Sequence, residues 1–211
     1  MDPMSFVPLD LLNLANFIPL DFTNPLILFS SILSPLLLVP SIPLDLDKII
    51  NNPVNIVLAV ILVDMIALVL ARNNLIGQVV KEWYNKFTFG AFVADVGSIS
   101  FGIFFSLLLF KYVLPKSIPF NLMTFIISVV IIQLIHDLTF AAIVNYYPEK
   151  QNNMIDVFKN YIGENGLYIL GVDASMMIAS VLLIYLFYNF ESVIIYTLLA
   201  FSLYVAMFLI Y

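Results

Sequence analysis

Long apolar stretches separated by short polar breaks are the feature of this sequence that most constrains its fold. A helix needs roughly 20 mainly apolar residues to cross a hydrocarbon core of about 30 Å. Only 10% of the residues are charged, whereas a soluble domain is typically about 25% charged. The sequence therefore predicts an all-α integral membrane protein. The expected spans are 53–71, 88–114, 120–147, 167–188 and 192–211.

Composition changes near residue 50 and divides the chain into an N-terminal arm, 1–50, and a transmembrane bundle, 51–211. Residues 1–53 hold eight of the eleven prolines and no glycine. An X-Pro-Leu-Asp pattern occurs three times, last at 42–45, and each Asp is placed to cap a short helix. Two prolines interrupt the apolar run at 24–43. This run is expected to be an interfacial or re-entrant segment, with a kinked sixth span as the alternative.

Two polar segments between the spans are expected to form amphipathic helices at the membrane surface. Residues 75–87 mix charged and aromatic side chains, and residues 149–166 place Ile155, Phe158 and Ile162 on one helical face. Aromatic residues near these segments predict an interfacial aromatic belt. They are Trp83, Tyr84, Tyr146, Tyr147, Tyr161 and Tyr168.

Lysine and arginine are distributed unevenly between the two sides that five spans create. The loops 72–87 and 148–166 carry five of these residues, and the opposite side carries three. Because cytoplasmic loops are enriched in Lys and Arg, the two loops are expected on the cytoplasmic side.

Several functional classes are excluded or disfavoured by composition. A net charge of -6 without a basic cluster argues against nucleic acid as a partner. The absence of cysteine excludes thiolate sites, and a single histidine excludes a multi-histidine metal centre. No serine elbow, phosphate loop or dinucleotide fingerprint occurs. The sequence leaves open whether the chain is an enzyme and favours a non-enzymatic role.

One aspartate lies in each of the first four expected spans: Asp64, Asp95, Asp137 and Asp173. Each is six to ten residues from a span end, and these four ends face the same side. At 1.5 Å per residue, they share a layer roughly 9 to 15 Å below that interface. A charge at mid-membrane costs on the order of 3 kcal/mol, so each carboxylate needs a partner, a proton or water.

Gln133 and His136 accompany Asp137 on the third span and complete a candidate polar cluster. Crowded carboxylates beside one imidazole suit a hard cation or a proton relay. Asp95, Asp137 and Asp173 are the candidate ligands of a divalent cation. The alternative is that the aspartates are hydrogen-bonded groups that only fix helix packing. The full cluster is Asp64, Asp95, Gln133, His136, Asp137 and Asp173.

The stretch from Trp83 to Asp173 contains Gln133, the pair His136-Asp137, Phe140, Pro148, Asp156-Val157-Phe158-Lys159, Tyr161 and Glu164. In these residues the chain resembles uncharacterised multi-pass membrane proteins of large DNA viruses. The resemblance covers less than half of the chain and rests on no described catalytic signature. It implies a place in a virion or host-derived membrane and no known activity.

Three functions stay open. The favoured one is a non-enzymatic component that organises a viral or host-derived membrane, with the lipid bilayer as its environment and its N-terminal arm binding other membrane or capsid proteins. The second is a cation or proton transporter or channel that uses the aspartate and histidine cluster. The third is an intramembrane lipid enzyme, which needs a divalent cation at the carboxylate layer.

Overall fold

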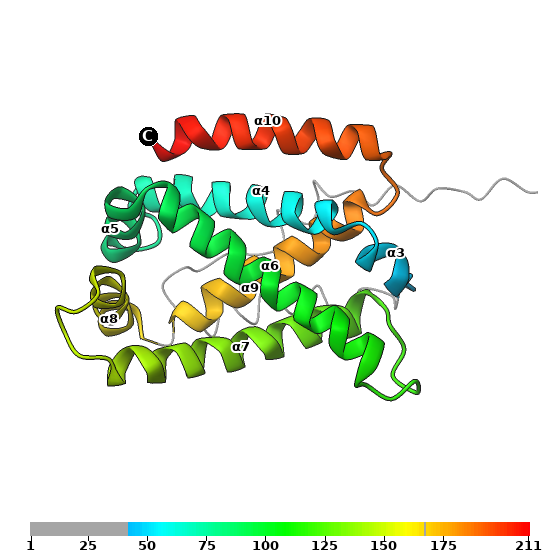
Figure 1. Cartoon of the computed structure of the whole chain (residues 1–211), viewed down its shortest axis with the longest axis horizontal. Coiled ribbons are helices and arrows are strands. Elements are labelled where there is room, and N and C mark those ends of the chain that lie inside the picture. Colours follow the sequence, from blue (N-terminus) through cyan, green and yellow to red (C-terminus); the bar gives the residue numbers. More distant parts are fainter. Residues whose placement is uncertain (1–41, 167) are drawn as a thin grey trace, which may run out of the picture.

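A computed structural model describes residues 42–166 and 168–211 of the chain. The N-terminal arm up to residue 41, with most of the expected interfacial segment or sixth span, lies outside the described residues. The described residues form helices and no strand, and one isolated antiparallel β-bridge joins Pro43 and Asn121. The helices are α3 (Leu46–Ile50), α4 (Pro53–Arg72), α5 (Gln78–Phe87), α6 (Phe89–Tyr112), α7 (Leu122–Tyr146), α8 (Asn153–Asn165), α9 (Tyr168–Phe187) and α10 (Ser192–Ile210) (Figure 1).

Five of these helices, α4, α6, α7, α9 and α10, are long and apolar enough to cross a membrane. Each coincides with one expected span, and no end differs by more than two residues. The chain is therefore a multi-pass integral membrane protein of the all-α class, as the sequence predicts.

Local chemistry explains where the spans begin. Pro53 is the first residue of α4, where its missing N–H leaves no hydrogen bond unmade. The Asn52 side chain at the N-cap position makes no capping hydrogen bond to this helix and instead donates to the Lys48 carbonyl at 2.7 Å. At the start of α7, Asn121 and Thr124 form a capping box in which each side chain bonds the other's backbone N–H.

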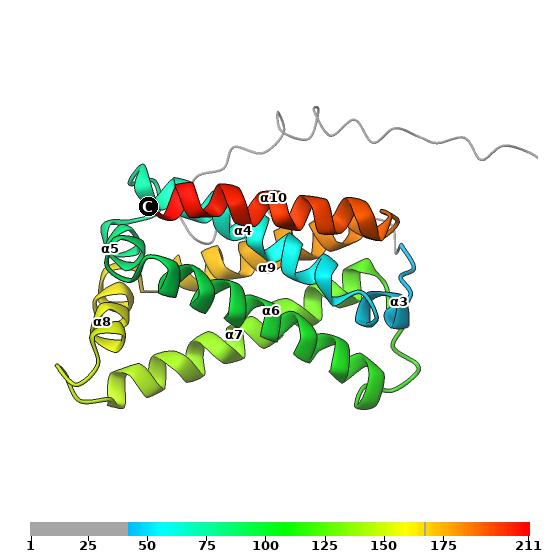
Figure 2. The ribbon, with the colours of Figure 1, turned by 45° about the horizontal axis from the view of Figure 1, so that its top comes forward.

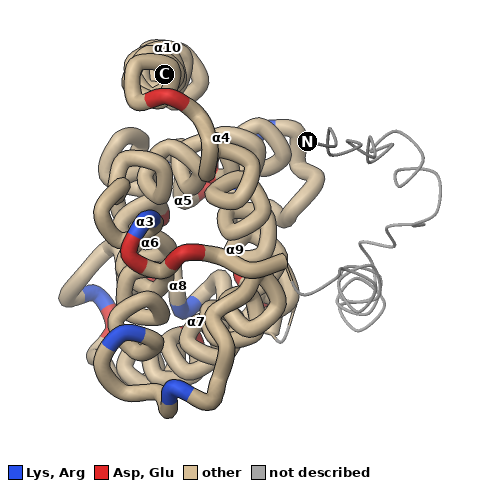
Figure 3. The backbone as a smooth tube through the Cα atoms, turned by 90° about the vertical axis from the view of Figure 1, so that its right-hand side faces the viewer, with Lys and Arg blue, Asp and Glu red and all other residues tan. Residues whose placement is uncertain are grey.

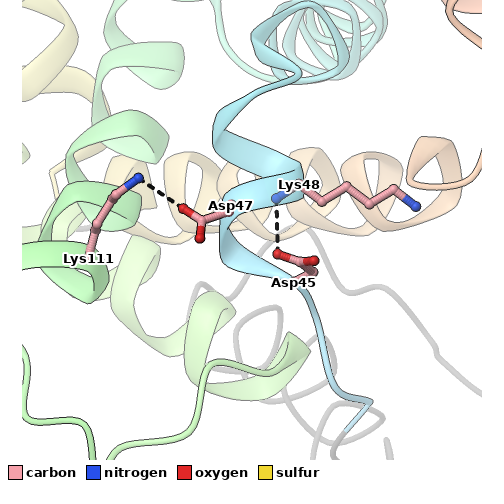
Figure 4. Close-up of polar contacts among 4 residues, drawn as sticks. All are labelled: Asp45, Asp47, Lys48 and Lys111. Atoms are coloured by element: carbon pink, nitrogen blue, oxygen red, sulfur yellow. Dashed lines mark hydrogen bonds and ion pairs between the residues drawn. The ribbon is translucent and has the colours of Figure 1, made fainter.

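Helix α3 is attached to one end of the bundle by polar contacts (Figure 4). The Lys48 N–H donates to Asp45 Oδ1 at 3.0 Å, so Asp45 caps α3 as the sequence predicts. Lys111 Nζ, near the end of α6, pairs with Asp47 Oδ1 at 2.9 Å. The Lys48 ammonium also lies 3.9 Å from the centre of the Tyr188 ring. These contacts hold the described start of the chain against the ends of α6 and α9.

Four spans form the centre of the bundle. Helix α4 packs against α6 and α9, and α7 packs against the same two helices. Helix α10 packs mainly on α4 and stands outside this group (Figure 3). Buried apolar side chains such as Phe125, Ile103 and Met177 fill the centre.

The two amphipathic helices lie together at the end of the bundle opposite α3 (Figures 1 and 2). Helices α5 and α8 pack against each other, α5 also contacts α4 and α6, and α8 contacts α7 and α9. The Val79 N–H donates to Glu164 Oε2 at 3.0 Å and joins the two helices. Both occupy the stretches predicted for surface helices, and together they cover the end of the bundle that is nearest to the aspartate layer.

Candidate functional site

A pocket of about 510 Å³ lies inside the bundle beneath α5 and α8. Residues from α5, α6, α7, α8 and α9 form its mainly apolar wall, with Ala67 of α4. The structure brings five of the six candidate residues together in this pocket and leaves Asp64 out. The five are Asp95, Gln133, His136, Asp137 and Asp173.

The three pocket carboxylates lie at similar depths in the bundle. Asp95 is six residues after the start of α6, Asp173 is five after the start of α9, and Asp137 is nine before the end of α7. At 1.5 Å per residue, these positions are about 8 to 14 Å from the helix ends. The carboxylate layer inferred from the sequence is therefore present in three dimensions.

Asp137 is held in place by its own helix. Its Oδ1 accepts a hydrogen bond from Gln133 Nε2 at 2.6 Å and lies 3.1 Å from His136 Nδ1. Its Oδ2 is buried and has no hydrogen-bond partner among the described residues, and only 9% of the side chain is exposed. A buried acceptor without a partner costs about 1 to 3 kcal/mol. Asp137 therefore lines the pocket with one carboxylate oxygen that no described donor satisfies.

The other two carboxylates differ in their surroundings. Asp95 Oδ2 accepts from Trp83 Nε1 of α5 at 3.0 Å. The Asp173 side chain lines the pocket from α9 and forms no hydrogen bond with the described residues. No lysine or arginine occurs among the described residues that line the pocket. The three carboxylates therefore share the pocket wall without a lysine or arginine among its described residues.

Asp64 lies outside the pocket, fully buried in α4. Its Oδ1 accepts from the Tyr84 hydroxyl at 2.9 Å, and its Oδ2 has no partner within the described residues. Burial, followed by the carboxylates of Asp95 and Asp64, raises the pKa of Tyr84 well above its ordinary value. The phenol thus stays protonated and can donate to Asp64. Because Tyr84 also lines the pocket, it connects Asp64 to the site.

The aromatic-belt prediction is wrong for Trp83 and Tyr84, which are only 6% and 3% exposed. Helix α5 turns both side chains inward, because their N–H and O–H groups meet the carboxylates of Asp95 and Asp64. Tyr146, in contrast, is 93% exposed, as expected of a belt residue. In the sequence, only the buried carboxylates themselves indicated that hydrogen-bond donors such as Trp83 and Tyr84 must lie nearby.

Aromatic rings form much of the pocket wall below α5 and α8. The Trp83 ring centre lies 4.7 Å from that of Phe158, and Phe158 meets Phe140 edge-on at 4.9 Å. Tyr161 of α8 lines the same wall. Burial, and then the carboxylates of Asp173, Asp95 and Asp137, raise the pKa of Tyr161 well above its ordinary value. Its phenol therefore stays neutral at the pocket wall.

The carboxylates do not form a preassembled metal centre in the described part of the chain. No three or more His, Asp or Glu side chains in that part are close enough together to hold a metal ion. Asp95, Asp137 and Asp173 share the pocket wall but approach it from three helices. The divalent-cation site stays a prediction.

The pocket opens on the side of the bundle between α6 and α7. Ala94 and Ser98 of α6 line the pocket and are exposed. His136 of α7 also lines the pocket, and 46% of its side chain is exposed. Both helices are candidate spans. The pocket therefore reaches the surface of the bundle beside two candidate spans.

Comparison with known proteins returned no matching family model, no matching curated protein and no matching solved structure. The function is therefore argued from the pocket itself.

Proposed function

We propose that the protein binds a cation in the acidic pocket and moves it across the membrane, as a transporter or channel for cations or protons. The observation that carries the proposal is the convergence of Asp95, Asp137 and Asp173 on one pocket without an opposing Lys or Arg among its described lining residues.

The unequal pairing of the carboxylates supports binding over a purely structural role. Aspartates that only fix helix packing are expected to satisfy their oxygens with donors from neighbouring helices. Asp95 does so through Trp83, but Asp137 Oδ2 has no partner within the described residues. The Asp173 side chain likewise forms no hydrogen bond with a described residue. Ionisable residues inside a membrane are costly, and they typically mark ion pathways and proton relays.

The pocket chemistry also suits exchange between a proton and another cation. A carboxylate in an apolar cavity is stable either protonated or next to a positive charge. Binding a cation therefore favours release of a proton, and release of the cation favours its return. Asp137 and Asp173 are the groups we expect to alternate between these states.

A liposome flux assay tests the proposal. The purified chain is reconstituted in liposomes that contain a dye sensitive to pH, K⁺, Na⁺ or Mg²⁺, and movement of each ion is followed after imposing a gradient of that ion. We expect Asp137→Asn combined with Asp173→Asn to abolish protein-dependent flux while helix content and monodispersity are kept. The matched control is Glu82→Gln, which neutralises an exposed carboxylate on α5.

Other results would favour the other functions. Full flux in the double variant, or no flux above empty liposomes under any gradient, would contradict transport and favour the membrane-organising role. That role assigns binding to the N-terminal arm, which lies outside the described residues. A lipid enzyme would instead show lipid turnover that a chelator abolishes.

The membrane and the orientation are proposed on separate grounds. The resemblance to viral multi-pass proteins supports a virion or host-derived membrane. Five Lys and Arg residues lie near α5 and α8, against three at the opposite end, which supports a cytoplasmic position for α5 and α8. Immunogold labelling of infected or expressing cells tests the first proposal.

A further inference from the structure

The size of the pocket indicates which kind of cation it takes. A volume of about 510 Å³ lies within the range of roughly 300 to 1,000 Å³ that is typical of small organic ligands. A dehydrated Ca²⁺ or Mg²⁺ ion instead needs several oxygen ligands at about 2.0 to 2.6 Å. The described residues offer no such group. The space and the ligand geometry thus favour an organic molecule.

The pocket wall supplies the two features that recognise an organic ammonium group. Negative charge comes from the carboxylates, including the Asp137 Oδ2 that has no partner in the described chain. Aromatic faces come from Trp83, Phe158 and Tyr161. Cations are attracted electrostatically to such faces, most strongly to that of tryptophan.

The position of the opening adds the requirement that the ligand is membrane-soluble. Ala94, Ser98 and His136 surround an entrance on the side of two spans. Apolar residues such as Leu138 and Ile169 line the pocket beside the charged groups. A ligand that enters here must combine an apolar body with a positive charge.

We infer that the pocket binds an amphipathic organic cation that enters from the bilayer between α6 and α7. The charged centre lies between Asp137 and Asp173, and the apolar body packs against Trp83 and Phe158. This inference rests on the proposed function and names the substrate class of the same site.

Trp83 makes binding directly measurable, because it is the only tryptophan in the chain and lines the pocket. Its fluorescence is recorded with the full chain in neutral phosphatidylcholine nanodiscs during titration with tetraphenylphosphonium. Tetraphenylborate is the control probe, since it has nearly the same shape and the opposite charge. We expect saturable quenching with the phosphonium and no saturable change with the borate.

Variants connect the signal to the carboxylates. We expect Asp137→Asn and Asp173→Asn each to weaken phosphonium binding at least tenfold, and Glu82→Gln to leave it unchanged. If either Asn variant misfolds, Ser98→Phe serves as the test. It narrows the entrance and keeps every carboxylate, so it should weaken or slow phosphonium binding. Unsaturable quenching, equal saturation by the borate, or unchanged binding in all three pocket variants would overturn the inference.

The two assays separate this inference from the proposed function. Asp-dependent flux of protons or metal ions without phosphonium binding would overturn the organic substrate and keep transport. Saturable, Asp-dependent phosphonium binding without flux of any cation, the phosphonium included, would support the binding site and contradict transport.

Discussion

Tyr84 on α5 donates a 2.9 Å hydrogen bond to Asp64 in the interior of α4. This contact joins a surface helix to a fully buried carboxylate, and the second oxygen of Asp64 has no partner within the described residues. The Tyr84 hydroxyl is thus the only described donor that stabilises this group. The contact adds to the Trp83–Asp95 hydrogen bond that also holds α5 over the pocket.

Tyr84→Phe is expected to destabilise the protein by about 1 to 3 kcal/mol, because both Asp64 oxygens then lack a described donor. The measurement is unfolding in detergent, followed by circular dichroism. In an Asp64→Leu background the same substitution leaves no carboxylate unpaired and should cost much less. An equal loss in both backgrounds would contradict the dependence on Asp64.

The fluorescence of Trp83 is expected to be that of a buried indole, because the side chain is 6% exposed and its Nε1 is hydrogen-bonded to Asp95. Its emission should be blue-shifted and weakly quenched by acrylamide. The control is a Trp83→Phe chain carrying Tyr146→Trp, since residue 146 is 93% exposed. Equal quenching of the two tryptophans would show that α5 lies with its aromatic face outward.

Gly102 allows α6 to approach α7 and α9 beneath the pocket. A Cβ at this position would lie 2.9 Å from Met177 Cε and 3.9 Å from Gln133 Oε1. Gly102→Leu should therefore overpack the bundle and lower its stability by about 1 to 3 kcal/mol. Gly97→Leu on the same helix is the control, because nothing lies within 4 Å of a Cβ there. Similar losses at the two positions would argue against close packing at Gly102.

The span boundaries could be read from the sequence because the bilayer demands long apolar runs and the breaks contain strong stop signals. Pro53 begins α4 as expected, and the end of α7 precedes Pro148. The shared depth of Asp95, Asp137 and Asp173 followed from counting residues along antiparallel helices. These features depend on local chemistry and on helix length, so they could be predicted without knowing which face of each helix points into the bundle.

The direction in which each side chain faces could not be read in the same way. The spans are apolar on nearly every face, so periodicity does not identify the buried side of α4. Asp64 therefore seemed equivalent to the other aspartates, although it faces Tyr84 and not the pocket. The inward turn of Trp83 was missed for a related reason, since aromatic residues in a surface helix suit a lipid interface equally well.

The orientation of the chain can be measured with single cysteines, because the natural sequence contains none. Gln151→Cys places a thiol in the exposed turn before α8, and Ser117→Cys places one in the exposed loop between α6 and α7. The loops that contain them, between α7 and α8 and between α6 and α7, lie at opposite ends of the bundle (Figure 1), and neither change alters a charge. In intact cells, an impermeant maleimide should label residue 117 and reach residue 151 only after permeabilisation.

Labelling of residue 151 alone in intact cells would reverse the proposed orientation. Labelling of both positions would contradict the placement of the two loops on opposite sides of the membrane.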